Sequence, residues 1–267
     1  MEAQLFGNVD KPAVIVVSTW DPLLPVTRGF VQELAEYARA HGESAVAVVL
    51  DPAPQRYLRG AANWPVYTSF DARLHFLLAG GLDGVVRIEF QEDDLLRGVY
   101  YLLDLVRTRI AIAEIWMRPH QTFGRDSRGS AMAIAIYAKK HGLVWKRPAM
   151  PETKVLATTV QQHLRRGEIA AAQAIVGLPP MLSRPESDEL ELAWRPGSYV
   201  VTPSLFADSD GTSDQIVVEL RKEADGLSYM RWPAPWIEHL TVLSGPGDAA
   251  VHSEALPGYA EHSVAAE

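Results

Sequence analysis

The sequence contains no cysteine among its 267 residues. Disulfides, thiolate nucleophiles and cysteine-ligated metal centres are therefore excluded. Basic residues are also in short supply, because 25 lysines and arginines stand against 33 aspartates and glutamates and give a net charge of −8. An acidic protein repels phosphate backbones, so we expect no general binding to nucleic acid.

Long apolar runs are missing as well. No run approaches the ~20 residues that a membrane-spanning helix requires. The first residues, MEAQLFGNVDK, have neither the basic start nor the apolar core of a signal peptide. We therefore expect no membrane association, and the absence of cysteine favours the reducing cytoplasm.

Hydrophobic residues make up 48% of the chain, which is enough for a sizeable core. Short β-branched apolar runs predict buried strands, and amphipathic stretches between them predict helices. The expected strands are residues 14–20, 45–50, 84–90, 110–117 and 143–147, and the expected helices are residues 27–41, 69–79, 91–108 and 127–141. Strands that alternate with helices indicate an α/β class with a parallel sheet flanked by helices.

The pattern changes after residue 150. Two short helices are expected at residues 158–166 and 168–176, and an acidic stretch at 183–191 is typical of a linker. Three short strands follow, at residues 197–202, 216–220 and 227–231. We therefore predict three parts: residues 1–182, a small β-rich C-terminal region at 183–244, and a disordered tail at 245–267.

Ligands of parallel α/β sheets bind beyond the carboxyl ends of the strands. In this sequence the corresponding segments are residues 19–21, 51–54 and 118–128. The first two contribute Thr19, Trp20, Asp21, Asp51 and Pro54. Asp21 fits two interpretations, since it either orients a ligand or caps the turn before Pro22.

Several short motifs occur in order on these elements. STWDPLLPVT (18–27) stands where a related family has G-N-F-D-G-V-H-x-G-H, and LDPAP (50–54) stands for F-D-P-H-P. GLDGVVRIEF (81–90) matches G-x-D-x-V-x-x-x-F. Further matches are RPHQTFGRDSRG (118–129), LATTVQ (156–161) and LRRGEIAAAQAIVGLP (164–179). Together they resemble the FAD synthetase (FMN adenylyltransferase) module of bacterial bifunctional riboflavin kinase/FAD synthetases.

The resemblance implies a Rossmann-like nucleotidyltransferase fold that binds FMN, FAD or ATP. It also implies a set of cofactor-binding residues. Arg125 and Arg128, which follow Gly124, are included in this set as candidate phosphate ligands. The set is Asp51, Phe123, Gly124, Arg125, Arg128, Thr158 and Thr159. Two interpretations stay open for Phe123, which either stacks on a ring or fills the core. Arg125 and Arg128 likewise either bind phosphate or pair with nearby acids.

The catalytic positions of the family are largely replaced. Its paired histidines fall within residues 23–27, which contain none, and its other charged donors correspond to Ala53 and Gln161. Because such donors stabilise a transferred phosphoryl group, we expect ordinary FMN adenylyltransferase chemistry to be lost. Arg28 is a substitute cation, and His120 is either a general base or an exposed loop histidine. Magnesium would be needed only if catalysis persists.

Three functions are compatible with these residues. The first is a protein that binds a flavin or adenine nucleotide without ordinary chemistry. The second is a divergent active nucleotidyltransferase, and the third is a noncatalytic structural or interaction protein. A homo-oligomer or a protein partner fits each of them, and the sequence does not choose the ligand.

Overall fold

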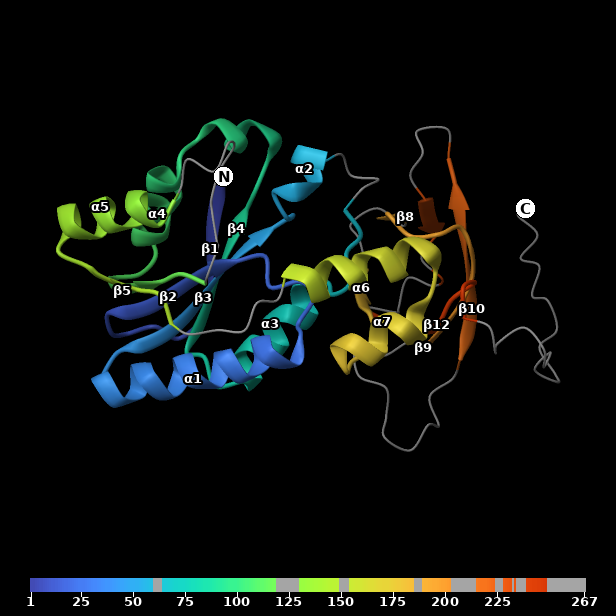
Figure 1. Cartoon of the computed structure of the whole chain (residues 1–267), viewed down its shortest axis with the longest axis horizontal. Coiled ribbons are helices and arrows are strands. Elements are labelled where there is room, and N and C mark those ends of the chain that lie inside the picture. The colour runs from blue at the N-terminus through green and yellow to red at the C-terminus, as the bar shows by residue number, and fades with distance from the viewer. Residues whose placement is uncertain are drawn as a thin grey trace, which may run out of the picture.

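The computed structural model describes residues 1–59, 64–118, 130–148, 154–184, 189–202, 215–223, 228–231, 233 and 239–248. These residues form two six-stranded sheets with helices packed against them (Figure 1). No helix in the described part of the chain is long and apolar enough to cross a membrane.

The first sheet has the strand order β1-β4-β3-β2-β5-β6. Strands β2 to β5 pair in parallel and β6 continues this direction, whereas β1 is antiparallel to β4. All six residues of β2 are buried, as expected for a strand covered on both faces. The bounds are β1 (Glu2–Gly7), β2 (Ala13–Ser18), β3 (Ser44–Asp51), β4 (Gly84–Glu89), β5 (Ile112–Trp116) and β6 (Val144–Lys146).

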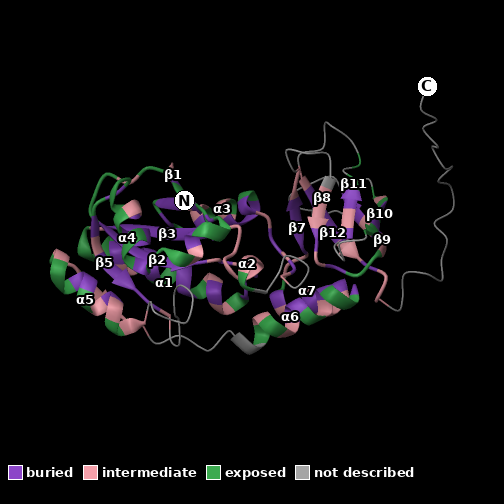
Figure 2. Cartoon of the chain, turned by 90° about the horizontal axis from the view of Figure 1, so that it is seen from above, coloured by how far each residue is buried: buried purple, intermediate pink, exposed green. Residues whose placement is uncertain are grey.

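Each face of this sheet carries its own core. One core includes residues of α1 (Pro25–His41) and α3 (Phe70–Ala79), and the other includes residues of α4 (Val99–Arg107) and α5 (Ala131–His141). The buried positions run along the central strands between these helices (Figure 2). A short helix α2 (Gln55–Arg59) follows β3, and a 3-10 helix η2 (Glu92–Leu96) follows β4.

The second sheet is antiparallel throughout and has the order β7-β12-β9-β10-β11-β8. Helices α6 (Lys154–Arg166) and α7 (Ile169–Val176) share a hydrophobic core with it. Leu24 and Tyr67, which lie in the part of the chain that forms the first sheet, are also buried in this core. The strands are β7 (Met181–Ser183), β8 (Glu189–Leu192), β9 (Gly197–Thr202), β10 (Ile216–Lys222), β11 (Ser228–Arg231) and β12 (His239–Ser244).

The expected fold class, a plain Rossmann-like nucleotidyltransferase fold with a parallel sheet, is wrong. The first sheet is mixed because β1 lies antiparallel along its edge. The second sheet is a six-stranded antiparallel half-barrel, larger than the small β-rich region that the sequence predicted. The stretch at 183–191 that was expected to be a linker begins at the end of strand β7 and ends within strand β8. The single helix expected at 91–108 is two helices, η2 and α4, with Gly98 between them.

The start of α3 is fixed by a side-chain cap. Ser69 Oγ accepts a hydrogen bond from the Ala72 amide at 3.4 Å and another from Ser183 Oγ at 2.8 Å. Ser130 caps α5 through the Ala133 amide at 3.4 Å. We expect Ser69→Ala to lower the free energy of unfolding by about 1–2 kcal/mol and Ser130→Ala by about 0.5–1 kcal/mol, because only Ser69 also joins the second sheet. Urea denaturation checks this, and the reverse order would contradict it.

Candidate functional site

The carboxyl end of β3 carries an aspartate shared by two arginines. Asp51 Oδ1 accepts a hydrogen bond from Arg73 on α3, and Asp51 Oδ2 accepts one from Arg87 on β4 at 2.8 Å. Burial acts to raise the pKa of Asp51, but the charges and hydrogen bonds of the two guanidinium groups outweigh it, and the pKa lies below its ordinary value. Asp51 is therefore a carboxylate with two cationic partners.

Arg73 lies inside the protein, with 3% of its side chain exposed. Its guanidinium also donates to the Thr19 carbonyl at 2.5 Å, just beyond the end of β2. A buried cation requires such partners, because an unpaired one loses its hydration without compensation. Arg73 thus ties the ends of β2 and β3 to α3.

Arg87 is the accessible cation of this group. Its side chain is 36% exposed, and its guanidinium carbon lies 4.6 Å from the centre of the Phe70 ring. Within the described part of the chain, the guanidinium makes one hydrogen bond, to Asp51, although it carries five N–H donors. Its Nε is buried and has no hydrogen-bond partner among those residues.

A third arginine, Arg118, follows β5. Its guanidinium donates to Ser18 Oγ, at the last residue of β2. Burial lowers the pKa of Arg118. Ser18 and Thr19 are consecutive, so Arg118 and Arg73 contact neighbouring residues at the carboxyl end of β2.

Asp21 holds a segment that joins the two halves of the protein. Its carboxylate accepts hydrogen bonds from the Tyr67 amide at 3.0 Å and the Thr68 amide at 2.8 Å. Thr68 in turn forms a β-bridge with Met181 in β7. Burial raises the pKa of Asp21, against the lowering effect of Arg73 and these amides. Asp21 therefore has a structural task that the sequence did not predict.

These five side chains form the edge cluster: Arg73, Arg87, Arg118, Asp21 and Asp51. Two of its guanidinium groups, those of Arg73 and Arg87, share the single carboxylate of Asp51, in a protein whose net charge is −8. A pair of arginines on one aspartate favours a small anion, and the forked guanidinium suits phosphate.

The other predicted site residues have varied surroundings. Trp20 is buried, has a φ of 57°, and donates its indole N–H to the Val48 carbonyl at 3.3 Å, so its ring belongs to the core. Pro54 precedes α2 and accepts from the Leu58 amide at 3.2 Å. Arg28 donates to the Val176 carbonyl at 3.3 Å, at the end of α7. Thr158 and Thr159 lie on α6, which packs on the second sheet.

Five predicted site residues lie outside the described residues. They are His120, Phe123, Gly124, Arg125 and Arg128. Their predicted roles stay predictions. Among the described residues, no group of three or more histidine, aspartate or glutamate side chains is arranged to hold a metal ion.

Arg73 and Arg87 were not predicted as site residues from the sequence. Both stand in apolar surroundings, Arg73 in the helix FDARLHFLLA and Arg87 in the strand GVVRIE. A charged residue inside a buried element must be paired. That rule, applied to the two elements, would have identified both arginines, although not their common partner.

Comparisons with known proteins identify no family. No family model matches the sequence, and no curated protein does. A similar solved structure is described as the crystal structure of a macrolide-efflux protein from Streptococcus pneumoniae. It shares 14% identity, covers 92% of this chain and 90% of its own, and has a TM-score of 0.59. At this identity the likeness shows a shared fold and nothing about function.

The expected membership of the FAD synthetase family is therefore wrong. No family or curated match supports it, and the structural neighbour carries a different description. The descriptions of the protein as FAD synthetase-like and as a nucleotidyltransferase depended on that resemblance and are wrong as well. The description Rossmann-like is also wrong. Each motif match was short, and the family's histidines were missing from the matches at 18–27 and 50–54, so the set followed the order of the elements more than their chemistry.

Proposed function

We propose that this protein binds a phosphorylated ligand of nucleotide size, an adenine nucleotide or a flavin mononucleotide, at the carboxyl edge of the first sheet. The observation that carries the proposal is Arg87. It is a half-exposed arginine that uses one donor within the described part of the chain and lies beside a second cation, Arg73. Phosphate is the anion that a forked donor of this kind binds best.

Two further features support this ligand class. Two guanidinium groups that share one carboxylate favour an anion over a neutral ligand. Aromatic side chains also gather near the cluster, with Phe70 under Arg87 and Tyr57 close to Phe90, their ring centres 6.1 Å apart. Aromatic rings suit the flat base or isoalloxazine of such a ligand.

The proposal is binding without catalysis. Asp21 and Asp51, the two carboxylates of the edge cluster, are both held by contacts within the protein. A general base needs a lone pair that is available to the substrate. Magnesium is accordingly not part of the proposal. The lack of cysteine agrees with a reducing cytoplasm as the compartment we propose.

The test replaces Arg87 with glutamine. We expect Arg87→Gln to weaken binding of FMN, AMP or ATP by about 1.5–3 kcal/mol, or roughly 10–150-fold, because a hydrogen bond to a charged group is lost. Riboflavin, which has no phosphate, should change less than about twofold. Isothermal titration calorimetry of both proteins against these ligands measures the effect.

Arg97→Gln is the matched control. Arg97 also pairs with an aspartate, Asp94, at 3.1 Å, and its guanidinium carbon lies 4.6 Å from the centre of the Tyr101 ring. It directly follows η2 and is not part of the edge cluster. It should leave every affinity unchanged. Equal losses for FMN and riboflavin in Arg87→Gln, or equal losses in the two variants, would refute a phosphate contact at Arg87.

A further inference from the structure

The outer strand of the first sheet has an open hydrogen-bonding edge. β1 is the terminal strand, and in the described part of the chain it pairs with β4 alone. In an antiparallel pair, alternate residues direct their N–H and C=O groups away from the partner strand. β1 therefore presents a row of backbone donors and acceptors, which is a template for another extended segment.

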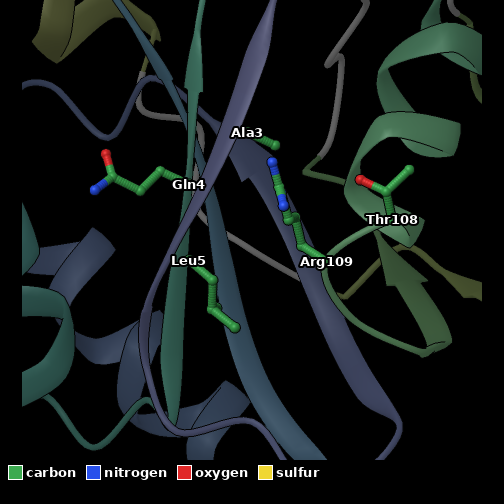
Figure 3. A pocket seen from close by; sticks show the side chains of 5 residues that line it. All are labelled: Ala3, Gln4, Leu5, Thr108 and Arg109. Atoms are coloured by element: carbon green, nitrogen blue, oxygen red, sulfur yellow. The ribbon is translucent and has the colours of Figure 1, made fainter.

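A pocket of about 430 Å³ lies along this edge. It is lined by three consecutive residues of β1, Ala3, Gln4 and Leu5, together with Thr108 and Arg109 in the turn after α4 (Figure 3). Because three residues in a row line it, the pocket follows the backbone of β1 as well as one face of the strand. It is an open hollow at the surface and not an enclosed cavity.

Arg109 supplies the charge of this pocket. Its side chain is exposed and makes no hydrogen bond or ion pair with any residue that the structure describes. Figure 3 shows the guanidinium directed toward Ala3, while Gln4 points to the opposite face of the sheet. An added strand would place every second side chain on the Arg109 face.

β1 is held firmly enough to act as a template. The main-chain nitrogen of Met1 donates to Asp94 Oδ1 at 3.1 Å, and the Asn8 amide donates to the Asp83 carbonyl at 3.0 Å. All six residues between them keep one register against β4. A fixed edge adds little ordering cost to strand addition.

From the open edge, the pocket and the exposed cation of Arg109, we propose that β1 binds an extended acidic peptide as an additional strand, with one carboxylate of the peptide paired to Arg109. Backbone hydrogen bonds to β1 give the affinity, and the ion pair selects an acidic residue at one position. Charge complementarity makes the partner an acidic peptide segment. This inference is independent of the ligand proposed for the edge cluster.

The test uses the full chain labelled with ¹⁵N and a blocked pentapeptide of alternating valine and threonine with a central glutamate. We expect saturable shifts of the Ala3, Gln4, Leu5 and Arg109 amides. The glutamate peptide should bind at least tenfold more tightly than its glutamine counterpart. Arg109→Gln should remove that difference, whereas Arg107→Gln should keep it, since Arg107 is a nearby arginine already engaged with His141 at 2.8 Å.

Two peptides, one N-methylated on its odd and one on its even residues, test the strand itself, and the peptide whose methyl groups face β1 should not bind. Equal affinity for the glutamate and glutamine peptides would overturn the ion pair, and binding of both N-methylated peptides would overturn strand addition. Two other results would also overturn the proposal. The first is that acetate alone reproduces the amide shifts. The second is that the β1 amides shift as the protein concentration rises and the molecular mass in solution doubles, because a second copy of the chain would then occupy the edge of β1.

Discussion

Replacing Asp51 with asparagine should lower the free energy of unfolding by about 3–5 kcal/mol, the cost of breaking a buried ion pair from one side. The variant leaves Arg73, with 3% of its side chain exposed, without its carboxylate. Asp104→Asn is the matched control. Asp104 is 59% exposed and lies 4.0 Å from Arg107, and its Oδ1 accepts a hydrogen bond from the Tyr137 hydroxyl at 2.6 Å, which the amide oxygen of asparagine can still accept. The loss of its charge should therefore cost less than about 1 kcal/mol.

A double variant distinguishes the loss of the ion pair from a general loss of stability. Combining Asp51→Asn with Arg73→Met removes the buried cation together with its partner, so part of the lost stability should return. Chemical denaturation of the four proteins measures the coupling. If the double variant loses as much as the two single variants added together, Asp51 and Arg73 are not coupled and the description of the edge cluster is wrong.

The pH dependence of stability has a defined sign at Asp51. Its pKa in the folded protein lies below the ordinary value, so its contribution is complete above the ordinary aspartate pKa. That contribution disappears as the pH falls through the lowered pKa. Asp51→Asn should therefore show a shallower loss of stability in acid than the wild type.

Replacing Asp21 with alanine should lower the free energy of unfolding by about 2–6 kcal/mol. Two buried amides, of Tyr67 and Thr68, lose their acceptor, and each unsatisfied group costs about 1–3 kcal/mol. Asp21→Asn should cost about half as much, because one acceptor remains and a charge that burial disfavours is removed. Thermal and chemical denaturation measure both.

Hydrogen exchange distinguishes this contact from a general loss of stability. Asp21→Ala should accelerate exchange at Tyr67 and Thr68 more than elsewhere. Asp83→Ala is the control, because the exposed Asp83 accepts from a single amide, that of Ala45, at 2.8 Å. Uniform acceleration across the chain, or a larger cost for Asp21→Asn than for Asp21→Ala, would contradict the role we assign to Asp21.

The central strands could be predicted because their signal is local. β2 and β3 are continuous apolar runs that are buried on both faces, and the sequence places them within two residues. β1, with the sequence EAQLFG, mixes polar, small and apolar residues and has no comparable signal. β8, ELEL, alternates in the manner of a strand but carries the acidic charge that led us to expect a linker.

The edge cluster could be predicted only in part. Asp21 and Asp51 were expected at the carboxyl edge because the position follows from topology. Their partners were not, since Tyr67, Arg73 and Arg87 are 22 to 46 residues away in sequence and are brought there by α3 and β4. Pairing across such separations is decided by tertiary packing, which no local pattern records.

The most direct measurement of the central claim is a titration of the wild-type protein with FMN and riboflavin under the same conditions. The two ligands share a ring system and differ by one phosphate, so their affinity ratio reports the contribution of the arginines. We expect FMN to bind at least tenfold more tightly than riboflavin, as a charge-assisted phosphate contact requires. Equal affinities, or no binding of FMN, AMP or ATP at millimolar concentration, would contradict an anion site and leave the edge cluster as a purely structural network.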